Sequence, residues 1–197
     1  MSYRTLFDAC QSLPLHVKRK PVRDTLCEIT GIKLRIVKTT LDVRVCRGMY
    51  LSPRNTTHRI VQQVGGAHVV VMPREGNNHC WERFVEVKEY MHVLDSADEA
   101  TDTGEQFDRL LAEFTTAGQF ATSSQMTGEI KAFWRAMGAL CPEHVRQELI
   151  AEKESRGADL TDLAIALRLK IPEQYVPNLF EPWYLENQGH LFDGRHA

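Results

Sequence analysis

The sequence has no apolar run near the roughly 18 residues that a membrane-spanning helix needs. Its opening residues, Met1 to Arg4, lead into a mixed segment without the apolar core of a secretory signal. Cysteine is scarce. The 5 cysteines among 197 residues are odd in number and widely spaced, which argues against a disulfide framework and against a cysteine-ligated zinc ribbon. These absences predict a cytoplasmic protein that does not engage a membrane.

The chain also lacks the glycine-rich loops and the strand–helix alternation that nucleotide-binding α/β folds carry. It contains no internal repeat and no low-complexity tract. What remains is an ordinary globular composition, with 43% apolar and 25% charged residues. A chain of this length can bury its own core, so we expect one domain, with at most a small appendage.

The formal charge of −2 hides an uneven distribution along the chain. Residues 1–74 hold 13 Lys/Arg and 4 Asp/Glu, a net of +9, so the remainder, with 11 and 22, carries −11. Such a split can mark a surface for nucleic acid or for an acidic partner. We favour the simpler interpretation that two halves of one domain neutralise each other. The basic run from Lys18 to Lys20 is interpreted as a solvated face, with an acidic partner or nucleic acid as the alternative.

The first half of the chain combines helical and extended patterns. Apolar residues at helical spacing predict helices at 2–13 and 22–30, the second ending near Gly31. Alternation with period two, or β-branched runs, then predicts extended segments. These are 32–36, 41–45, 48–51, a weak candidate at 58–63, and 68–72, followed by a loop over 74–80.

The second half is helical almost throughout. An apolar stripe containing Phe84, Val87 and Met91 predicts a helix over 81–95, followed by an acidic loop to Gly104. Further helices are expected near 107–114, 128–140, 143–155 and 160–169, with an N-cap among Ser123, Ser124 and Thr127. The proline- and aromatic-rich residues 172–197 are expected to wrap over the surface, or to form an oligomer contact. A small sheet followed by a helical half makes an α+β domain.

Residues 88–92 read Lys-Glu-Tyr-Met-His and carry the chemistry that the sequence suggests. Zinc peptidases place His-Glu-x-x-His on a helix, where the two histidines share a face and hold zinc while the glutamate polarises the attacking water. Here Glu89 and His92 occupy their positions in that motif, and Lys88 stands where the first histidine belongs. Glu-x-x-His alone is a weak signal on a helix.

The flanking residues strengthen it. Arg83-Phe84 resembles the Arg-Phe pair that opens this helix in the ImmA/IrrE family of zinc metallopeptidases. Residues 129–142 resemble the later helix of that family, Glu-x-x-Ala-x-x-Phe-Ala-x-x-Leu-Leu-x-Pro. The matching positions are Glu129, Ala132, Ala136, Leu140 and Pro142, whereas Arg135 replaces the phenylalanine and Ala139 a leucine.

The resemblance implies a zincin-like domain over residues 1–171, with a small mixed sheet and then a mostly helical half that carries the motif helix. Residues 172–197 would be a tail packed on it. Residue by residue, His92 and Glu129 match zinc ligands, Glu89 matches the general base, and Lys88 takes the place of the missing ligand. All four roles would be vestigial, so no cofactor is expected, with zinc as the cofactor if the site is functional.

Lysine is a poor zinc ligand because its amine must first lose a proton. We therefore expect the Lys88 ammonium to occupy the space of the missing cation and to pair with Glu129 or Glu89. This predicts a catalytically inactive homologue that acts as a regulatory protein-binding module. Active members of the family cleave transcription regulators, often in prophages and other mobile elements, so such a regulator is the candidate partner.

Two alternatives stay open. An active zinc-dependent metallopeptidase would use His92, Glu129 and an unrecognised third ligand, with Glu89 as base. A DNA-binding regulator would use the basic first half, and residues 161–172 do resemble the entry to a helix-turn-helix. Residues 143–181, however, hold 5 Lys/Arg against 8 Asp/Glu, a net of −3 that phosphates would repel, so nucleic acid is not the favoured partner.

Overall fold

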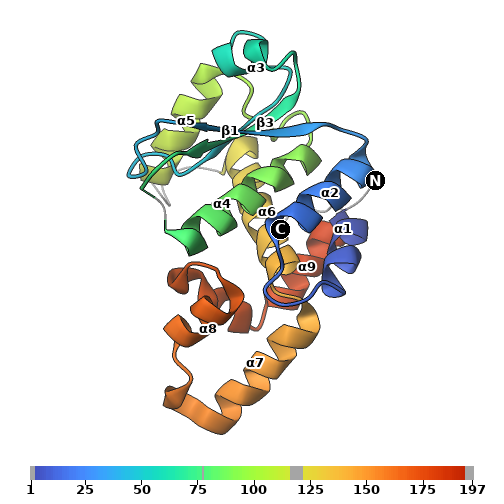
Figure 1. Cartoon of the computed structure of the whole chain (residues 1–197), viewed down its shortest axis with the longest axis vertical. Helices are drawn as coiled ribbons and strands as arrows, with labels where there is room; N and C mark the ends of the chain where they lie inside the picture. The colour runs from blue at the N-terminus through green and yellow to red at the C-terminus, as the bar shows by residue number, and fades with distance from the viewer. Residues whose placement is uncertain (1–2, 77, 116–121, 194–197) are drawn as a thin grey trace.

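A computed structural model of the chain describes residues 3–76, 78–115 and 122–193. Its elements form an α+β fold in which a small sheet lies at one end of a helical body (Figure 1). The strands are β1 (Leu34–Thr39), β2 (Met49–Leu51) and β3 (His68–Pro73). Their order is β1-β3-β2, with β1 parallel and β2 antiparallel to β3, so the sheet is mixed, as predicted. The helices are α1 (Tyr3–Gln11), α2 (Arg19–Thr30), α3 (Arg59–Gln63), α4 (His79–Met91), α5 (Gly104–Thr115), α6 (Ser124–Leu140), α7 (Glu143–Arg156), α8 (Asp162–Leu169) and α9 (Tyr184–Phe192), with 3₁₀ segments η1 (His92–Leu94), η2 (Gly157–Asp159) and η3 (Glu173–Phe180).

The central strand β3 is buried on both faces, which explains its unbroken apolar sequence. Successive side chains of a strand point to opposite faces. Val70 and Met72 therefore join the main core beneath α4, whereas Val69 and Val71 pack with Val61 of α3 in a smaller cluster. Helices α4 and α3 thus lie on opposite faces of the sheet (Figure 1).

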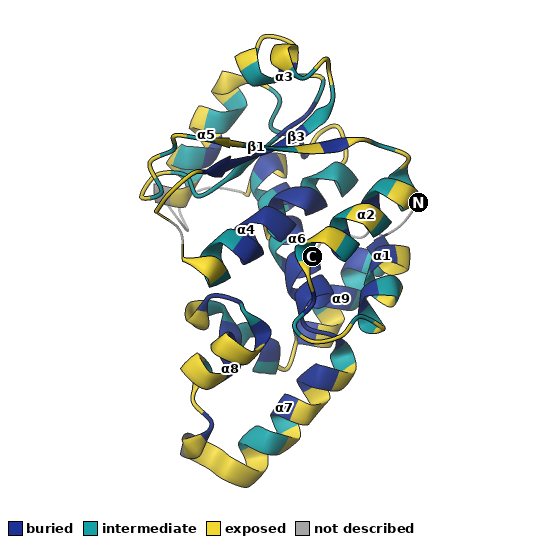
Figure 2. Ribbon diagram, in the orientation of Figure 1, coloured by how far each residue is buried: buried dark blue, intermediate teal, exposed yellow. Residues whose placement is uncertain are grey.

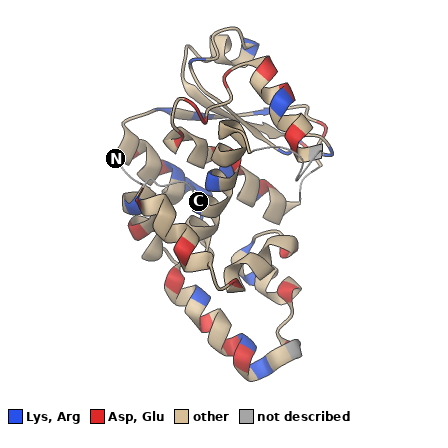
Figure 3. Cartoon of the chain, turned by 180° about the vertical axis from the view of Figure 1, so that it is seen from behind, with Lys and Arg blue, Asp and Glu red and all other residues tan. Residues whose placement is uncertain are grey.

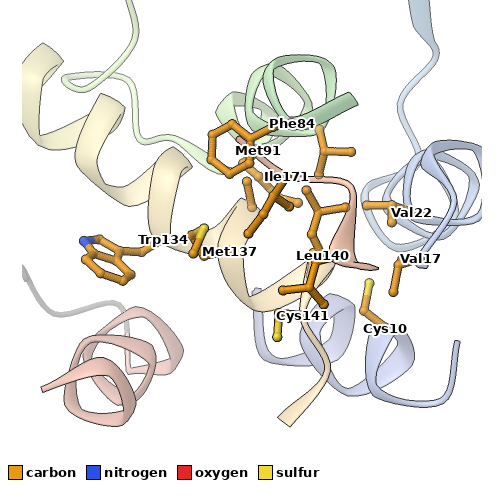
Figure 4. Close-up of a cluster of buried hydrophobic side chains, with 14 of the residues drawn as sticks. Cys10, Val17, Val22, Phe84, Met91, Trp134, Met137, Leu140, Cys141 and Ile171 are labelled. Carbon is orange, nitrogen blue, oxygen red and sulfur yellow. The ribbon is translucent and has the colours of Figure 1, made fainter. Parts of the chain in front are cut away.

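The motif helix α4 is held by a cap at its N-terminus and by core packing along its length. The Asn78 side chain caps it by accepting a hydrogen bond from the Trp81 N–H at 3.0 Å. Farther along, Phe84 and Met91 enter the core beside Leu140 of α6 (Figure 4). Gly48 permits β2 to lie directly on α4, because a Cβ at this position would come within 2.6 Å of Val85 Cγ1.

Two of the predicted extended segments are wrong. Residues 41–45 form a turn in which the Asp42 carboxylate accepts the Arg44 N–H at 3.0 Å, so local side-chain bonding overrides the alternating pattern. Residues 59–63 form α3, whose N-cap is the His58 ring accepting the Ile60 N–H at 3.2 Å. The other predicted strands and helices are confirmed, including the N-cap at Ser123, which accepts the Met126 N–H at 3.1 Å.

Residues 172–192 are more regular than a surface wrap. They form η3 and α9, and α9 packs against α1 and α6 near the start of the chain (Figure 1). The Tyr3 hydroxyl donates to Gln188 Oε1 at 2.7 Å, and the Gln188 amide donates to the Trp134 carbonyl at 2.9 Å. The two ends of the described chain therefore close the same core.

The opposite charges of the two halves meet in ion pairs. Arg19 contacts Glu86 at 2.6 Å and Glu82 at 3.3 Å, and Arg54 contacts Asp102 at 2.9 Å. Lys38 also pairs with Glu82, at 2.8 Å. These pairs agree with mutual neutralisation of the halves, and they place part of the basic run of the sequence against the motif helix. Among the described residues, no helix is long and apolar enough to cross a bilayer.

Candidate functional site

The structure brings Lys88, Glu89, His92 and Glu129 together where α4 and η1 face the beginning of α6. Lys88 and His92 lie one turn apart and so share the face that α6 covers. The Lys88 Nζ donates to Glu129 Oε2 and also lies 3.0 Å from Glu89 Oε1. His92 Nε2 lies 3.4 Å from Glu129 Oε1 and 3.7 Å from Glu89 Oε2. The predicted pairing of the Lys88 ammonium with these two carboxylates is therefore present.

The charges in this cluster reinforce one another. Burial opposes the charged form of Lys88, but the carboxylates of Glu129 and Glu89 outweigh it and raise the pKa of Lys88 above its usual value. Burial likewise opposes a charged His92, yet Glu129 and Asp95 raise its pKa to about 10. For Glu129, burial favours the neutral acid, and Lys88 and His92 reverse this and lower its pKa below the ordinary range. At neutral pH the cluster therefore consists of protonated bases held by an ionised carboxylate.

A second pair of residues orients His92. Its Nδ1 hydrogen-bonds to Asp95 Oδ2 at 2.6 Å, which turns Nε2 toward Glu129. Arg135 holds the other side of Asp95, donating to Oδ1 at 2.8 Å and to the Met91 carbonyl at 3.3 Å. A carboxylate behind a histidine is the arrangement that orients metal-binding histidines. Sequence reasoning missed this pair, although Asp95 lies three residues after His92 and Arg135 was noted as a departure from the family pattern.

The residues present do not fit a catalytic zinc site. Such a site needs three protein ligands and one open position. Here two donors, His92 Nε2 and Glu129, face a protonated ammonium instead of a third ligand. In the part of the chain that the structure describes, no group of three His, Cys, Asp or Glu side chains is placed to hold a metal. His68, one of the histidines nearest in sequence, is engaged by the Tyr50 hydroxyl at 2.5 Å.

The cluster forms the floor of a cavity of about 830 Å³. This volume lies within the range of small-molecule and cofactor sites, roughly 300–1,000 Å³. The walls come from β2, the turn at residues 43–48, α5, the start of α4 and η3, and they are rich in apolar and aromatic side chains. They include Val45, Met49, Tyr50, Trp81, Phe107, Leu111, Phe114 and Tyr175. Val45 and Phe114 are 66% and 56% exposed, so the cavity presents large apolar side chains to an incoming molecule.

The His92 environment predicts a pH dependence of stability. A base whose pKa is raised on folding stabilises the protein fully below its unfolded pKa, and this contribution is lost as pH rises through the folded pKa. For His92 the window runs from 6.5 to about 10. We expect the free energy of unfolding, measured with urea, to fall across this window by on the order of 5 kcal/mol.

The matched control is His92→Asn, which keeps a donor for Asp95 but cannot be protonated. Its unfolding free energy should depend much less on pH in the same window. An equal slope in the wild type and in this variant would show that other groups, and not His92, set the pH dependence.

Comparisons of the chain with protein-family models, with curated proteins and with solved structures find no match.

Proposed function

We propose that this protein is a non-catalytic relative of the ImmA/IrrE-type zincins, in which the Lys88 ammonium stands where an active member holds zinc. In this role it binds a protein partner, with a transcription regulator as the candidate, through the cavity above Lys88 and does not cut it. The contact of one ammonium with both Glu129 and Glu89 is the observation that supports the proposal best.

The pairing removes both parts of a metallopeptidase mechanism. Zinc would polarise the scissile carbonyl and the attacking water. A fixed ammonium beside two carboxylates satisfies them electrostatically without offering an open coordination position. Glu89, the residue that matches the general base, is 3% exposed and pairs with Lys88, so it is not poised to take a proton from water.

The cavity itself is suited to binding. Its apolar walls offer burial for bulky side chains of a partner, and burial of such anchors dominates the affinity of most protein interfaces. The floor is chemically closed, because each carboxylate that faces Lys88 already has a cationic neighbour. We therefore expect the partner segment to be held chiefly by apolar contacts along the walls.

A peptide selection tests this function. Random peptides selected on the immobilised protein in the presence of a chelator should include sequences with bulky apolar side chains, because no metal is needed. Their affinity for the double variant Val45→Asp, Phe114→Asp should fall at least about 10-fold, since both side chains are exposed on the cavity wall. Leu185→Asp is the control, because Leu185 is 52% exposed and lies outside the residues that line the cavity.

The same peptides distinguish the alternative, an active metallopeptidase. Incubated with the protein and zinc, they should remain intact by mass spectrometry. Specific zinc-dependent cleavage that Glu89→Gln abolishes without unfolding the protein would contradict the proposal. That result would establish an unrecognised third ligand beside His92 and Glu129.

A further inference from the structure

A second exposed apolar surface lies on α8. The preceding helix, α7, extends away from the body of the molecule (Figure 1). The chain then turns back through η2 and enters α8. Leu163 and Leu167 lie one turn apart on α8 and are 50% and 52% exposed. Figure 2 shows exposed positions on both α7 and α8, in contrast to the buried sides of α4 and α6. Two large apolar side chains at this spacing form one continuous stripe.

The stripe borders a hollow of about 550 Å³. Leu163 and Leu167 line it together with Ala166, Ile171 and Pro177, and Trp81 of α4 lines both this hollow and the Lys88 cavity. The two leucines therefore border a hollow in which apolar residues lie beside the polar Asn78, Asp162, Glu173 and Gln174.

The surface is held rigidly. Ile165 and Leu169, on the opposite side of α8, are fully buried. The Arg83 guanidinium of α4 donates to the Leu169 and Lys170 carbonyls at 2.8 Å each and so fixes the end of the helix. A preformed surface loses little conformational entropy when a partner binds.

The charges around the stripe favour a basic partner. Of the residues that line the hollow, Asp162 and Glu173 are acidic and none is lysine or arginine. On α7 and α8, Lys153 pairs with Asp162, and Arg168 pairs with Glu152 and Glu148. Alternating charges are visible along α7 in Figure 3. Exposed carboxylates remain at Glu154, Asp159 and Glu173, in a segment (residues 143–181) whose net charge is −3, from 5 basic and 8 acidic residues. This charge repels nucleic acid and attracts lysine and arginine side chains.

We propose that α8 and η3 form a docking surface for a basic amphipathic helix of a partner protein. Apolar side chains of that helix would pack on Leu163, Leu167 and the adjoining hollow, and its lysine or arginine residues would face Glu173 and Asp159. Helices commonly bind grooves in this way, through apolar anchors at i and i+3 or i+4 with charged residues beside them. The hollow shares no residue with the cluster of Lys88, Glu89, His92 and Glu129, although Trp81 lines both the hollow and the Lys88 cavity, and this inference does not depend on the proposed function.

The test uses a fluorescein-labelled synthetic peptide of about 18 residues, built from leucine and lysine in an amphipathic helical pattern. Fluorescence anisotropy should show saturable binding that weakens at higher salt, because charge complementarity contributes. The double variant Leu163→Asp, Leu167→Asp should bind at least about 10-fold more weakly. The milder variant Leu163→Ser, Leu167→Ser carries the same expectation if the aspartates unfold the helix, and Leu185→Asp should bind like the wild type.

Two peptide results would overturn the proposal. One is a peptide of the same pattern with glutamate in place of lysine that binds equally well, which removes the charge argument. The other is unchanged affinity of both leucine variants, with amide shifts in NMR spectra confined to the cavity walls. Two further results would assign the surface to a different occupant. In the first, sedimentation velocity shows that the wild type self-associates and that the leucine variants do not. In the second, the wild type binds anionic lipid vesicles, the leucine variants do not, and the peptide binds neither protein.

Discussion

Replacing Lys88 with histidine is expected to convert the protein into one that binds zinc. The purified Lys88→His variant should contain about one equivalent of zinc by elemental analysis, whereas the wild type should contain little. The reason lies in the geometry of α4 and α6. Lys88 Nζ and the His92 ring already meet at the same carboxylate, because Nζ donates to Glu129 and His92 Nε2 lies 3.4 Å from it. An imidazole at residue 88 would complete a set of two histidines and one glutamate.

The effect should be large because the substitution changes two quantities in the same direction. It adds a third ligand, and it removes a cation that repels any metal ion at this position. Asp95 already orients His92 through Nδ1, at 2.6 Å, so part of the supporting hydrogen bonding is in place. Losing a residue that only supports a metal ligand typically lowers metal affinity by about 10- to 100-fold. Gaining a ligand should have a larger effect, so we expect the affinity for zinc to rise by at least about 10²-fold.

Two further variants make this result specific. Glu129→Gln added to Lys88→His should lose the zinc again, while Glu89→Gln should retain it, because Glu89 matches the general base and not a ligand. Lys88→Met should gain no zinc, which excludes an effect of charge removal alone. Stoichiometric zinc in the wild type would contradict the expectation and would favour the active metallopeptidase.

The contacts of the site could be predicted from the sequence where they depend on helical periodicity. Lys88, Glu89 and His92 are fixed relative to one another because they lie on consecutive turns of one helical segment. Glu129 was predicted only through the resemblance of residues 129–142 to the later helix of the ImmA/IrrE family. The pairing of Lys88 with Glu129 follows from charge once those two helices are adjacent. The assignment of the whole domain to the zincin class stays a prediction.

The parts that sequence reasoning missed depend on contacts between distant segments. The cavity wall combines the turn around Val45 with Phe107 and Phe114 of α5, and no local pattern shows that these segments face each other. The turn itself was predicted as a strand, because alternating Leu41, Val43 and Val45 outweighed the preference of Asp42 for a local hydrogen bond. Arg135 shows the same limitation, because its ion pair with Asp95 joins residues 40 positions apart and is visible only in the fold.

In the sequence Arg83 is half of the Arg-Phe pair that resembles the ImmA/IrrE family, and the structure gives its side chain a physical role. Its side chain is 2% exposed and has no carboxylate partner among the ion pairs of the described residues. Instead it donates to the carbonyls of Val17, Leu169 and Lys170, which join the segment before α2 and the end of α8 to the motif helix. The end of α8 carries the negative end of the helix dipole, so the guanidinium remains stable there. Burial lowers the pKa of Arg83 to about 10, which still leaves it charged at neutral pH.

We therefore expect Arg83→Met to destabilise the protein by about 3–5 kcal/mol, measured by urea unfolding. The buried carbonyls of Val17 and Leu169 and the partly buried carbonyl of Lys170 lose their donor, and the thioether supplies none. A loss of this size is a large share of the stability of a typical domain, which is about 5–15 kcal/mol. Arg83→Lys should lose less, since an ammonium can still reach part of the set but cannot span it as a planar fork does. Arg35→Met, at an exposed position of β1, should change stability by no more than about 0.5 kcal/mol.

Hydrogen exchange should locate the damage, with amides of α8 opening more readily in Arg83→Met than in Arg35→Met. A loss below about 1 kcal/mol would contradict this role, because an arginine that bridges three segments of the core cannot be removed at the cost of one exposed hydrogen bond.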